Sequence, residues 1–225
     1  MSCVIFDLDG TLLDTIPSIL NHVNETLGVH GLSPISYEEC RAFIGHGARR
    51  LISCAFAARG VTEEAIVQSA LARYNAAYDA DPYVGTHPYD GVHELLRALE
   101  REGGRLCVVS NKPQPTVERL LSHFFDDVHF SVIVGGRDDL PLKPDPAVGH
   151  FVSEQLSIDL SQMTVVGDSD VDMHFARSLG VRGVGVSWGF RSVECLLDAG
   201  ADVIAHRASQ LGALLLRPGE QSASI

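Results

Sequence analysis

The sequence predicts an α/β fold in which helices cover both faces of a parallel sheet. Short runs rich in Val and Ile recur along the 225 residues, and stretches with helical spacing separate most of them. This alternation is typical of a parallel sheet. One long interval, residues 15–85, has helical patterning and no convincing strand. It predicts a second, helical unit inserted into the first.

Five apolar runs have the length and composition of buried strands. They span residues 3–6, 106–109, 130–134, 163–166 and 181–186. Helical spacing lies between such runs, as at residues 91–102 and 115–124. We therefore expect the five runs to form the parallel sheet of a core domain.

The strand-free interval is expected to be joined to this core by two linkers. It opens with Thr15 as an N-cap near Pro17 and closes in a stretch rich in Pro and Gly at residues 81–88. The end of the chain has little to bury and is expected to be disordered. The predicted division is a core of residues 1–14 and 86–217, a helical insertion of residues 15–85 and a tail of residues 218–225.

The formal net charge of −12 bears on the partners of the chain. It argues against nonspecific binding to nucleic acid, and an anionic substrate would need a local cation to attract it. No apolar run reaches the roughly 20 residues of a membrane-spanning helix, so no membrane partner is expected. The first residues enter a strand-like run without the features of a secretory signal, so we expect a cytoplasmic protein.

Three acidic residues follow predicted strands, at the edge where open parallel sheets bind ligands. Asp7 and Asp9 follow the first run at i and i+2, so in extended chain they point to the same side, and Asp168 follows the fourth run. Their mutual repulsion would be costly unless a divalent cation lay among the oxygens. Oxygen ligands favour a hard ion, and Mg²⁺ is the usual choice beside a phosphate. We therefore predict a Mg²⁺ site here.

Lys143 is the predicted local cation. It is one of two lysines in the chain, and the nearby Pro141 and Pro144 make its segment stiff. Taken singly, an Asp-x-Asp-Gly-Thr segment is often a turn and a lysine is usually solvated. The joint occurrence of these residues after strands favours a phosphate site over those alternatives.

Four segments resemble the signature motifs of the haloacid dehalogenase superfamily. They are Phe-Asp-Leu-Asp-Gly-Thr-Leu-Leu-Asp-Thr at 6–15, Val-Val-Ser-Asn-Lys-Pro at 108–113, Lys143-Pro144, and Val-Val-Gly-Asp-Ser-Asp-Val-Asp at 165–172. The resemblance covers nearly the whole chain. It implies a Rossmann-like core and a helical cap inserted just after the first strand, in agreement with the expected insertion.

The resemblance also implies a role for each matching residue. Asp7 would be the nucleophile that forms an aspartyl phosphate, and Asp9 would protonate the leaving alcohol and then activate the hydrolytic water. Asp168 would ligate Mg²⁺ beside Asp7 and the backbone carbonyl of Asp9. Asp172 would steer a metal-bound water or Lys143 from behind these ligands. The phosphoryl oxygens would be held by Thr11, Ser110, Asn111 and Lys143.

Single residues distinguish the branches of the superfamily. Dehalogenases of this fold lack the second acid, so Asp9 argues against them. Phosphonatases use a cap lysine, and residues 15–85 contain none. A phosphosugar mutase of the β-phosphoglucomutase type has a histidine in its first cap helix, which the spacing would put at Ile19. A mutase is therefore disfavoured, but it stays open as an alternative.

The branch that remains is a phosphatase. Residues 135–146 and the Ser-Asn-Lys-Pro segment resemble phosphoglycolate phosphatases, although the loop before Lys143 is shorter and Asp90 stands where proline is common. We expect Mg²⁺-dependent hydrolysis of a small phosphate monoester, with phosphoglycolate first and a sugar phosphate, nucleotide or pyrophosphate as alternatives. A binding or regulatory module without catalysis is a third hypothesis. The protein is expected to be a monomer or a homodimer.

Specificity is expected to come from a loop of the insertion at residues 43–50. Its glycines, Gly45 among them, allow close approach of the backbone to a ligand. His46 could touch the substrate, and Arg49 or Arg41 could pair with a substrate carboxylate. The alternative is that these three side chains are ordinary exposed residues that do not contact the substrate.

Overall fold

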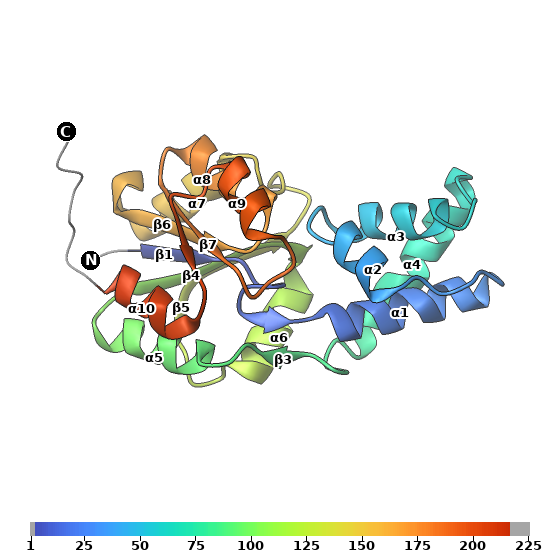
Figure 1. Cartoon of the computed structure of the whole chain (residues 1–225), viewed down its shortest axis with the longest axis horizontal. Helices are drawn as coiled ribbons and strands as arrows, with labels where there is room; N and C mark the ends of the chain where they lie inside the picture. The colour runs from blue at the N-terminus through green and yellow to red at the C-terminus, as the bar shows by residue number, and fades with distance from the viewer. Residues whose placement is uncertain (1–2, 217–225) are drawn as a thin grey trace.

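The computed structural model of the chain describes residues 3–216. Its centre is a six-stranded sheet of order β5-β4-β1-β6-β7-β8, in which neighbouring strands run parallel (Figure 1). This confirms the predicted fold class. The strands are β1 (Cys3–Phe6), β4 (Arg105–Pro113), β5 (Phe130–Gly136), β6 (Met163–Gly167), β7 (Arg182–Val186) and β8 (Val203–Ala205).

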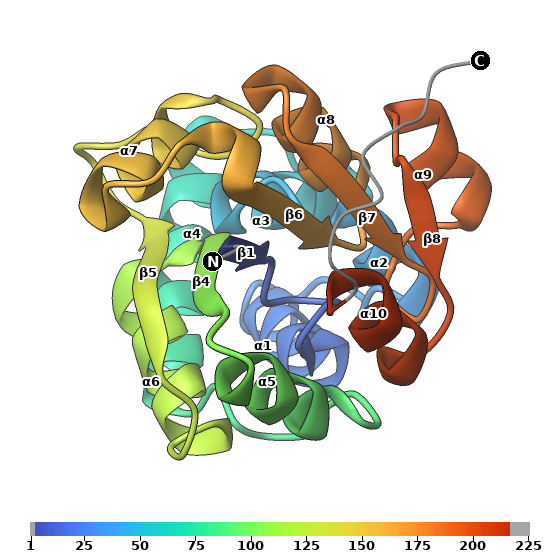
Figure 2. The same cartoon turned by 90° about the vertical axis from the view of Figure 1, so that its left-hand side faces the viewer.

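Helices cover both faces of this sheet. They are α5 (Val92–Arg101), α6 (Gln114–Phe124), α7 (Ala147–Leu156), α8 (Asp170–Leu179), α9 (Val193–Ala199) and α10 (Ala208–Leu215), with a short 3-10 helix, η1 (Leu160–Gln162). Alternate residues of β1 point to opposite faces. Val4 and Phe6 pack with α5, α6 and α10, whereas Cys3 and Ile5 pack with α7 and α8. Figure 2 shows these two groups of helices on opposite sides of the strands.

The helical insertion lies beyond the end of the sheet, as Figure 1 shows. Its helices are α1 (Ile16–Val29), α2 (Tyr37–Phe43), α3 (Ala48–Ala57) and α4 (Glu64–Ala80), which pack around their own buried cluster. Two short strands, β2 (Leu13–Asp14) and β3 (His87–Pro88), pair antiparallel where the chain leaves and re-enters the core. Thr15 is the N-cap residue of α1, but its side chain makes no capping hydrogen bond. The boundaries of the domains stay a prediction.

The structure differs from the sequence analysis at several strands. β2, β3 and β8 were missed because two or three residues are too few for a periodic pattern. β4 runs on to Pro113, beyond the predicted end at Val109, because its register against β5 shifts and Pro113 pairs with Gly136. The predicted tail lies outside the described residues. Within residues 3–216, no helix has the length and apolar character needed to cross a membrane.

Candidate active site

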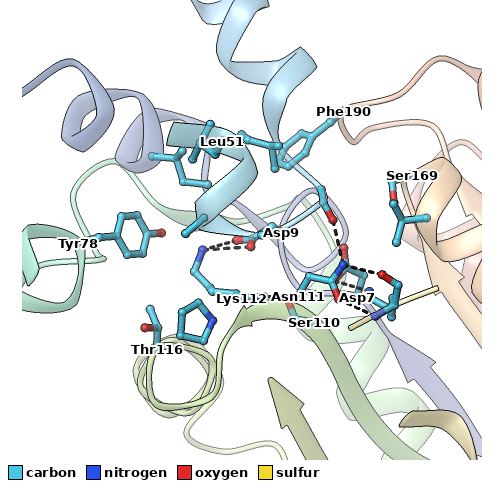
Figure 3. A pocket seen from close by; sticks show the side chains of 18 of the residues that line it. Asp7, Asp9, Leu51, Tyr78, Ser110, Asn111, Lys112, Thr116, Ser169 and Phe190 are labelled. Atoms are coloured by element: carbon cyan, nitrogen blue, oxygen red, sulfur yellow. Dashed lines mark hydrogen bonds and ion pairs between the residues drawn. The ribbon is translucent and has the colours of Figure 1, made fainter. Parts of the chain in front are cut away.

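A cavity opens where the carboxyl ends of β1, β4 and β6 face the helical insertion (Figure 3). Asp7 and Asp9 reach it after β1, Ser110 and Lys112 from β4, and Tyr78 from α4. Its empty volume is about 770 Å³, a value that includes the open mouth and the solvent there. The cavity occupies the edge at which open parallel sheets bind ligands.

Lys143 joins two of the carboxylates in this cavity. Its ammonium nitrogen lies 2.9 Å from Asp7 Oδ1 and 2.6 Å from Asp172 Oδ1. Its backbone N–H donates to the side-chain oxygen of Asn111 at 2.8 Å, and Ser169 donates to the second oxygen of Asp172 from its backbone and its hydroxyl. Burial lowers the pKa of Lys143, but Asp172 and Asp7 outweigh this effect and raise it above its ordinary value. The lysine is therefore a charged group held in place from two sides.

Asp168 lies fully buried directly after β6. The hydroxyl of Thr11 donates to one of its oxygens at 2.9 Å, and the backbone N–H of Phe190 donates to the other at 2.7 Å. Gly10 and Gly189 pack so closely against this carboxyl group that a Cβ on either would overlap it. Thr11 thus contacts Asp168. The contact with the phosphoryl oxygens that the resemblance implies for Thr11 stays a prediction.

The three carboxylates of Asp7, Asp168 and Asp172 fit a divalent cation. One oxygen of each lies within 4.8 Å of the others. Burial raises the pKa of Asp7 to about 7; Lys143 opposes this shift, and Asp172 and Asp9 add to it. Burial also raises the pKa of Asp168 well above its ordinary value, with a further contribution from Asp7 and Asp172.

Repulsion among the carboxylates adds to the effect of burial on the pKa of Asp7 and Asp168. Three buried carboxylates face a single ammonium group, so negative charge remains uncompensated, and a cation such as Mg²⁺ would balance it with oxygen ligands alone. The structure brings Asp172 directly beside Asp7 and Asp168. The resemblance implies a place for Asp172 behind the ligands, and this role stays a prediction.

The carboxylate of Asp9 is turned toward Lys112. The Lys112 ammonium lies 2.9 Å and 3.1 Å from the two Asp9 oxygens, and it lies 4.6 Å from the centre of the Tyr78 ring (Figure 3). Burial lowers the pKa of Lys112, but Asp9 and Tyr78 outweigh this and raise it above its ordinary value. The sequence analysis gave Lys112 no role, although both lysines of the chain fall in the motifs.

Ser110 and Asn111 both line the cavity, as the motif suggested. The oxygen of the Ser110 hydroxyl accepts from the Lys112 backbone N–H at 3.3 Å. The amide of Asn111 donates to the carbonyls of Gly45 and Lys143 at 3.1 and 3.0 Å. Asn111 therefore ties the predicted specificity loop of the insertion, through Gly45, to the Lys143 segment of the core.

Of the three specificity residues predicted in the insertion, Gly45 lines the cavity, whereas His46 and Arg49 are not among the residues that line it. Arg49 instead forms an exposed ion pair with Glu64 at 2.7 Å. Arg41 donates to the backbone carbonyl of Phe190. A specificity role for His46 and Arg49 stays a prediction.

Several lining residues carried no pattern that sequence reasoning recognised. Arg191 follows β7 and donates to the carbonyls of Arg41 and Ile44, both at 2.7 Å. Tyr74 and Tyr78 lie one turn apart on α4. The i, i+4 spacing of the two tyrosines was the available signal, but such pairs more often serve the core.

Comparisons with known proteins agree with the motifs. The model of the haloacid dehalogenase-like hydrolase family matches residues 4–186. A phosphoglycolate phosphatase of Rhodospirillum rubrum is 35% identical over 214 residues, which cover 93% of this chain and 88% of that protein. One of Cereibacter sphaeroides is 38% identical over 193 residues, which cover 85% and 87%. The crystal structure of a predicted phosphoglycolate phosphatase from Haemophilus somnus has a TM-score of 0.87 at 26% identity and covers 95% of this chain and 97% of its own.

Proposed function

Because the chain belongs to the haloacid dehalogenase-like hydrolases, we propose that it hydrolyses a small phosphate monoester in a Mg²⁺-dependent reaction. The family and the class of phosphoric monoester hydrolase are those predicted from the motifs. The observation that carries the proposal is the convergence of Asp7, Asp168 and Asp172 beside Lys143. Phosphoglycolate is the proposed substrate, because relatives that match most of the chain are phosphoglycolate phosphatases. The cytoplasmic location and the monomeric or dimeric state stay predictions.

In the proposed first step, a carboxylate oxygen of Asp7 attacks phosphorus while the bond from phosphorus to the alcohol oxygen breaks. Asp9 gives its proton to the departing oxygen. Lys143, at 2.9 Å from Asp7, is near enough to pair with a phosphoryl oxygen during the attack. Positioning and charge neutralisation then supply most of the rate enhancement, as is general for phosphoryl transfer.

In the proposed second step, water attacks the phosphorus of the aspartyl phosphate. Asp9, now ionised, takes a proton from this water, phosphate departs and the Asp7 carboxylate is restored. Asp7, Asp168 and the backbone carbonyl of Asp9 are the proposed Mg²⁺ ligands, with Asp172 beside them. When bound there, Mg²⁺ neutralises charge on the phosphoryl group.

The environment of Ile19 supports hydrolysis over a phosphosugar mutase. Ile19 lines the cavity from α1, where the spacing would put the histidine of a mutase. His22 lies one turn later on the same helix, and its Nδ1 lies 2.8 Å from the carbonyl oxygen of Ser18. His22 is not among the residues that line the cavity, so α1 offers the cavity an apolar side chain at this position.

Phosphate release tests the proposal. Phosphoglycolate, a sugar phosphate, a nucleotide and pyrophosphate are compared with and without Mg²⁺. We expect the highest kcat/KM with phosphoglycolate, loss of activity in EDTA, and a loss of at least about 100-fold in Asp168→Asn. Asp198→Asn, on the exposed face of α9, is the matched control and should keep full activity. Absence of Mg²⁺-dependent phosphate release from every ester would overturn the proposal, and an isomerised phosphate as product would indicate a mutase.

A further inference from the structure

The two lysines of the chain both line the same cavity. Both side chains are buried, with 4% of Lys143 and 6% of Lys112 exposed. Lys143 contacts the predicted nucleophile Asp7, whereas Lys112 contacts Asp9, the predicted acid for the leaving group. Burial of an ammonium group removes its hydration and costs free energy, so each lysine needs polar partners that offset this cost. The position of Lys112 is therefore on the leaving-group side of the reaction.

Lys112 has capacity for a further partner. An ammonium group has three N–H donors, and its partner Asp9 offers two oxygens, at 2.9 and 3.1 Å. One donor is thus available to an additional acceptor. The ammonium also lies over the Tyr78 ring, but the hydroxyl of Tyr78 forms no hydrogen bond with it in the described structure. An acceptor from a ligand in the cavity can therefore take the remaining donor.

Tyr78 presents a second donor at the same place. The residue is 4% exposed and lines the cavity, and its buried hydroxyl has no hydrogen-bond partner within the described chain. Figure 3 shows this hydroxyl on the side of the ring that faces Lys112. Buried hydroxyl groups are normally hydrogen-bonded, because an unpaired one costs free energy. A ligand acceptor beside Lys112 would satisfy it.

We propose that Lys112 and Tyr78 form a subsite for a carboxylate on the leaving group of the substrate. This inference rests on the proposed phosphatase function and names the chemical class of its substrate: phosphate esters of short hydroxy acids. Asp9 must contact the oxygen that departs, and Lys112 contacts both oxygens of Asp9. In such an ester one carbon separates that oxygen from the carboxylate, so the carboxylate reaches the neighbourhood of Lys112. The subsite would favour it over an alkyl group of equal size.

The test compares phosphoglycolate with ethyl phosphate, in which a methyl group replaces the carboxylate. We expect Lys112→Met to reduce kcat/KM at least about tenfold more for phosphoglycolate than for ethyl phosphate, and Tyr78→Phe to reduce it selectively by about threefold or more. Tyr37→Phe, an exposed tyrosine on α2, is the control and should change neither value. An equal loss with both substrates would mean that Lys112 serves only to position Asp9, and it would overturn the subsite, as would no loss at all.

A binding measurement separates recognition from rate. Asp7→Asn, which should bind without turnover, is titrated calorimetrically with each ester in the presence of Mg²⁺, with and without Lys112→Met. We expect the second substitution to raise the Kd of phosphoglycolate about tenfold and to leave that of ethyl phosphate within about twofold. If the wild-type protein hydrolyses ethyl phosphate as well as phosphoglycolate, only the subsite is refuted. If it hydrolyses neither ester, nor any other in Mg²⁺, the proposed function itself fails.

Discussion

Thr11 donates its hydroxyl hydrogen to Asp168 at 2.9 Å, although 157 positions separate the two residues in the sequence. The contact joins the loop after β1 to the end of β6 and fixes the orientation of a buried carboxylate. Loss of a group that orients a metal ligand in this way typically lowers metal affinity by about 10- to 100-fold. We therefore expect Thr11 to position a ligand of the predicted metal site.

Removal of this hydroxyl should weaken metal binding. Thr11→Val keeps the shape of the side chain and leaves one Asp168 oxygen without its donor, so we expect the Mg²⁺ affinity to fall by about 10- to 100-fold. The measurement is the Mg²⁺ concentration at half-maximal activity, together with the Mg²⁺-dependent increase in Tm. Thr11→Ser restores the donor and should recover most of the affinity. Unchanged Mg²⁺ dependence in Thr11→Val would show that the hydrogen bond is dispensable.

A methyl group at Gly189 should displace the same carboxylate. Gly189→Ala puts a Cβ into the space of Asp168, so we expect a loss of unfolding free energy of about 1–3 kcal/mol and a weaker response to Mg²⁺. Gly28→Ala is the matched control, because a Cβ there meets nothing within 4 Å and the residue lies in α1. This control should be neutral or stabilising by up to about 1 kcal/mol. Equal stability of the two variants in chemical denaturation would contradict the close packing around Asp168.

The metal-free protein should lose stability as the pH rises from about 4 to about 7. Burial raises the pKa of Asp7 to about 7 in the folded chain, against 3.8 for an ordinary aspartate. Between these values the folded state holds a proton that the unfolded state has released, so the stability is greatest below the lower value and declines toward the upper one. The raised pKa of Asp168 acts in the same direction.

Urea unfolding in EDTA at pH 5 and pH 7.5 measures this effect. We expect an unfolding free energy lower by about 1–3 kcal/mol at the higher pH. Asp7→Asn removes one of the titrating groups and should flatten the dependence, and saturating Mg²⁺ should do so as well, because it binds the ionised carboxylates. An unfolding free energy that rises between pH 5 and pH 7.5, by the same amount in the wild type and in Asp7→Asn, would contradict this prediction.

The sequence allowed the main part of this site to be predicted because a parallel sheet collects strand ends at one edge. Asp7, Asp168 and Lys143 are far apart in the chain, yet they meet at one edge of the sheet. Each follows a predicted strand, either directly or in the loop after it. Periodicity and residue type were sufficient for that step. The positions of β1, β4 and β6 follow from runs of buried apolar residues in the same way.

The orientation of individual side chains could not be obtained from the sequence. Asp172 turns toward the cavity because it forms a capping box with Ser169 at the start of α8. Ser169 contacts its Oδ2, so Oδ1 is free to contact Lys143. Lys112 points at Asp9 from the last third of β4, where the register against β5 shifts. Both arrangements depend on local geometry that leaves no periodic pattern. The contribution of Tyr78 depends on how α4 packs over the sheet edge, which the sequence of the helix does not specify.

The most direct test of the account is the identity of the residue that carries phosphate during turnover. Wild-type protein mixed with phosphoglycolate and Mg²⁺ is quenched in acid within the first turnovers, and its peptides are analysed by mass spectrometry. The account predicts one added phosphoryl group on the peptide that contains Asp7, full labelling in the Asp198→Asn control, and none in Asp7→Asn. Rapid Mg²⁺-dependent phosphate release by Asp7→Asn, or a phosphoryl group on a different residue, would contradict it.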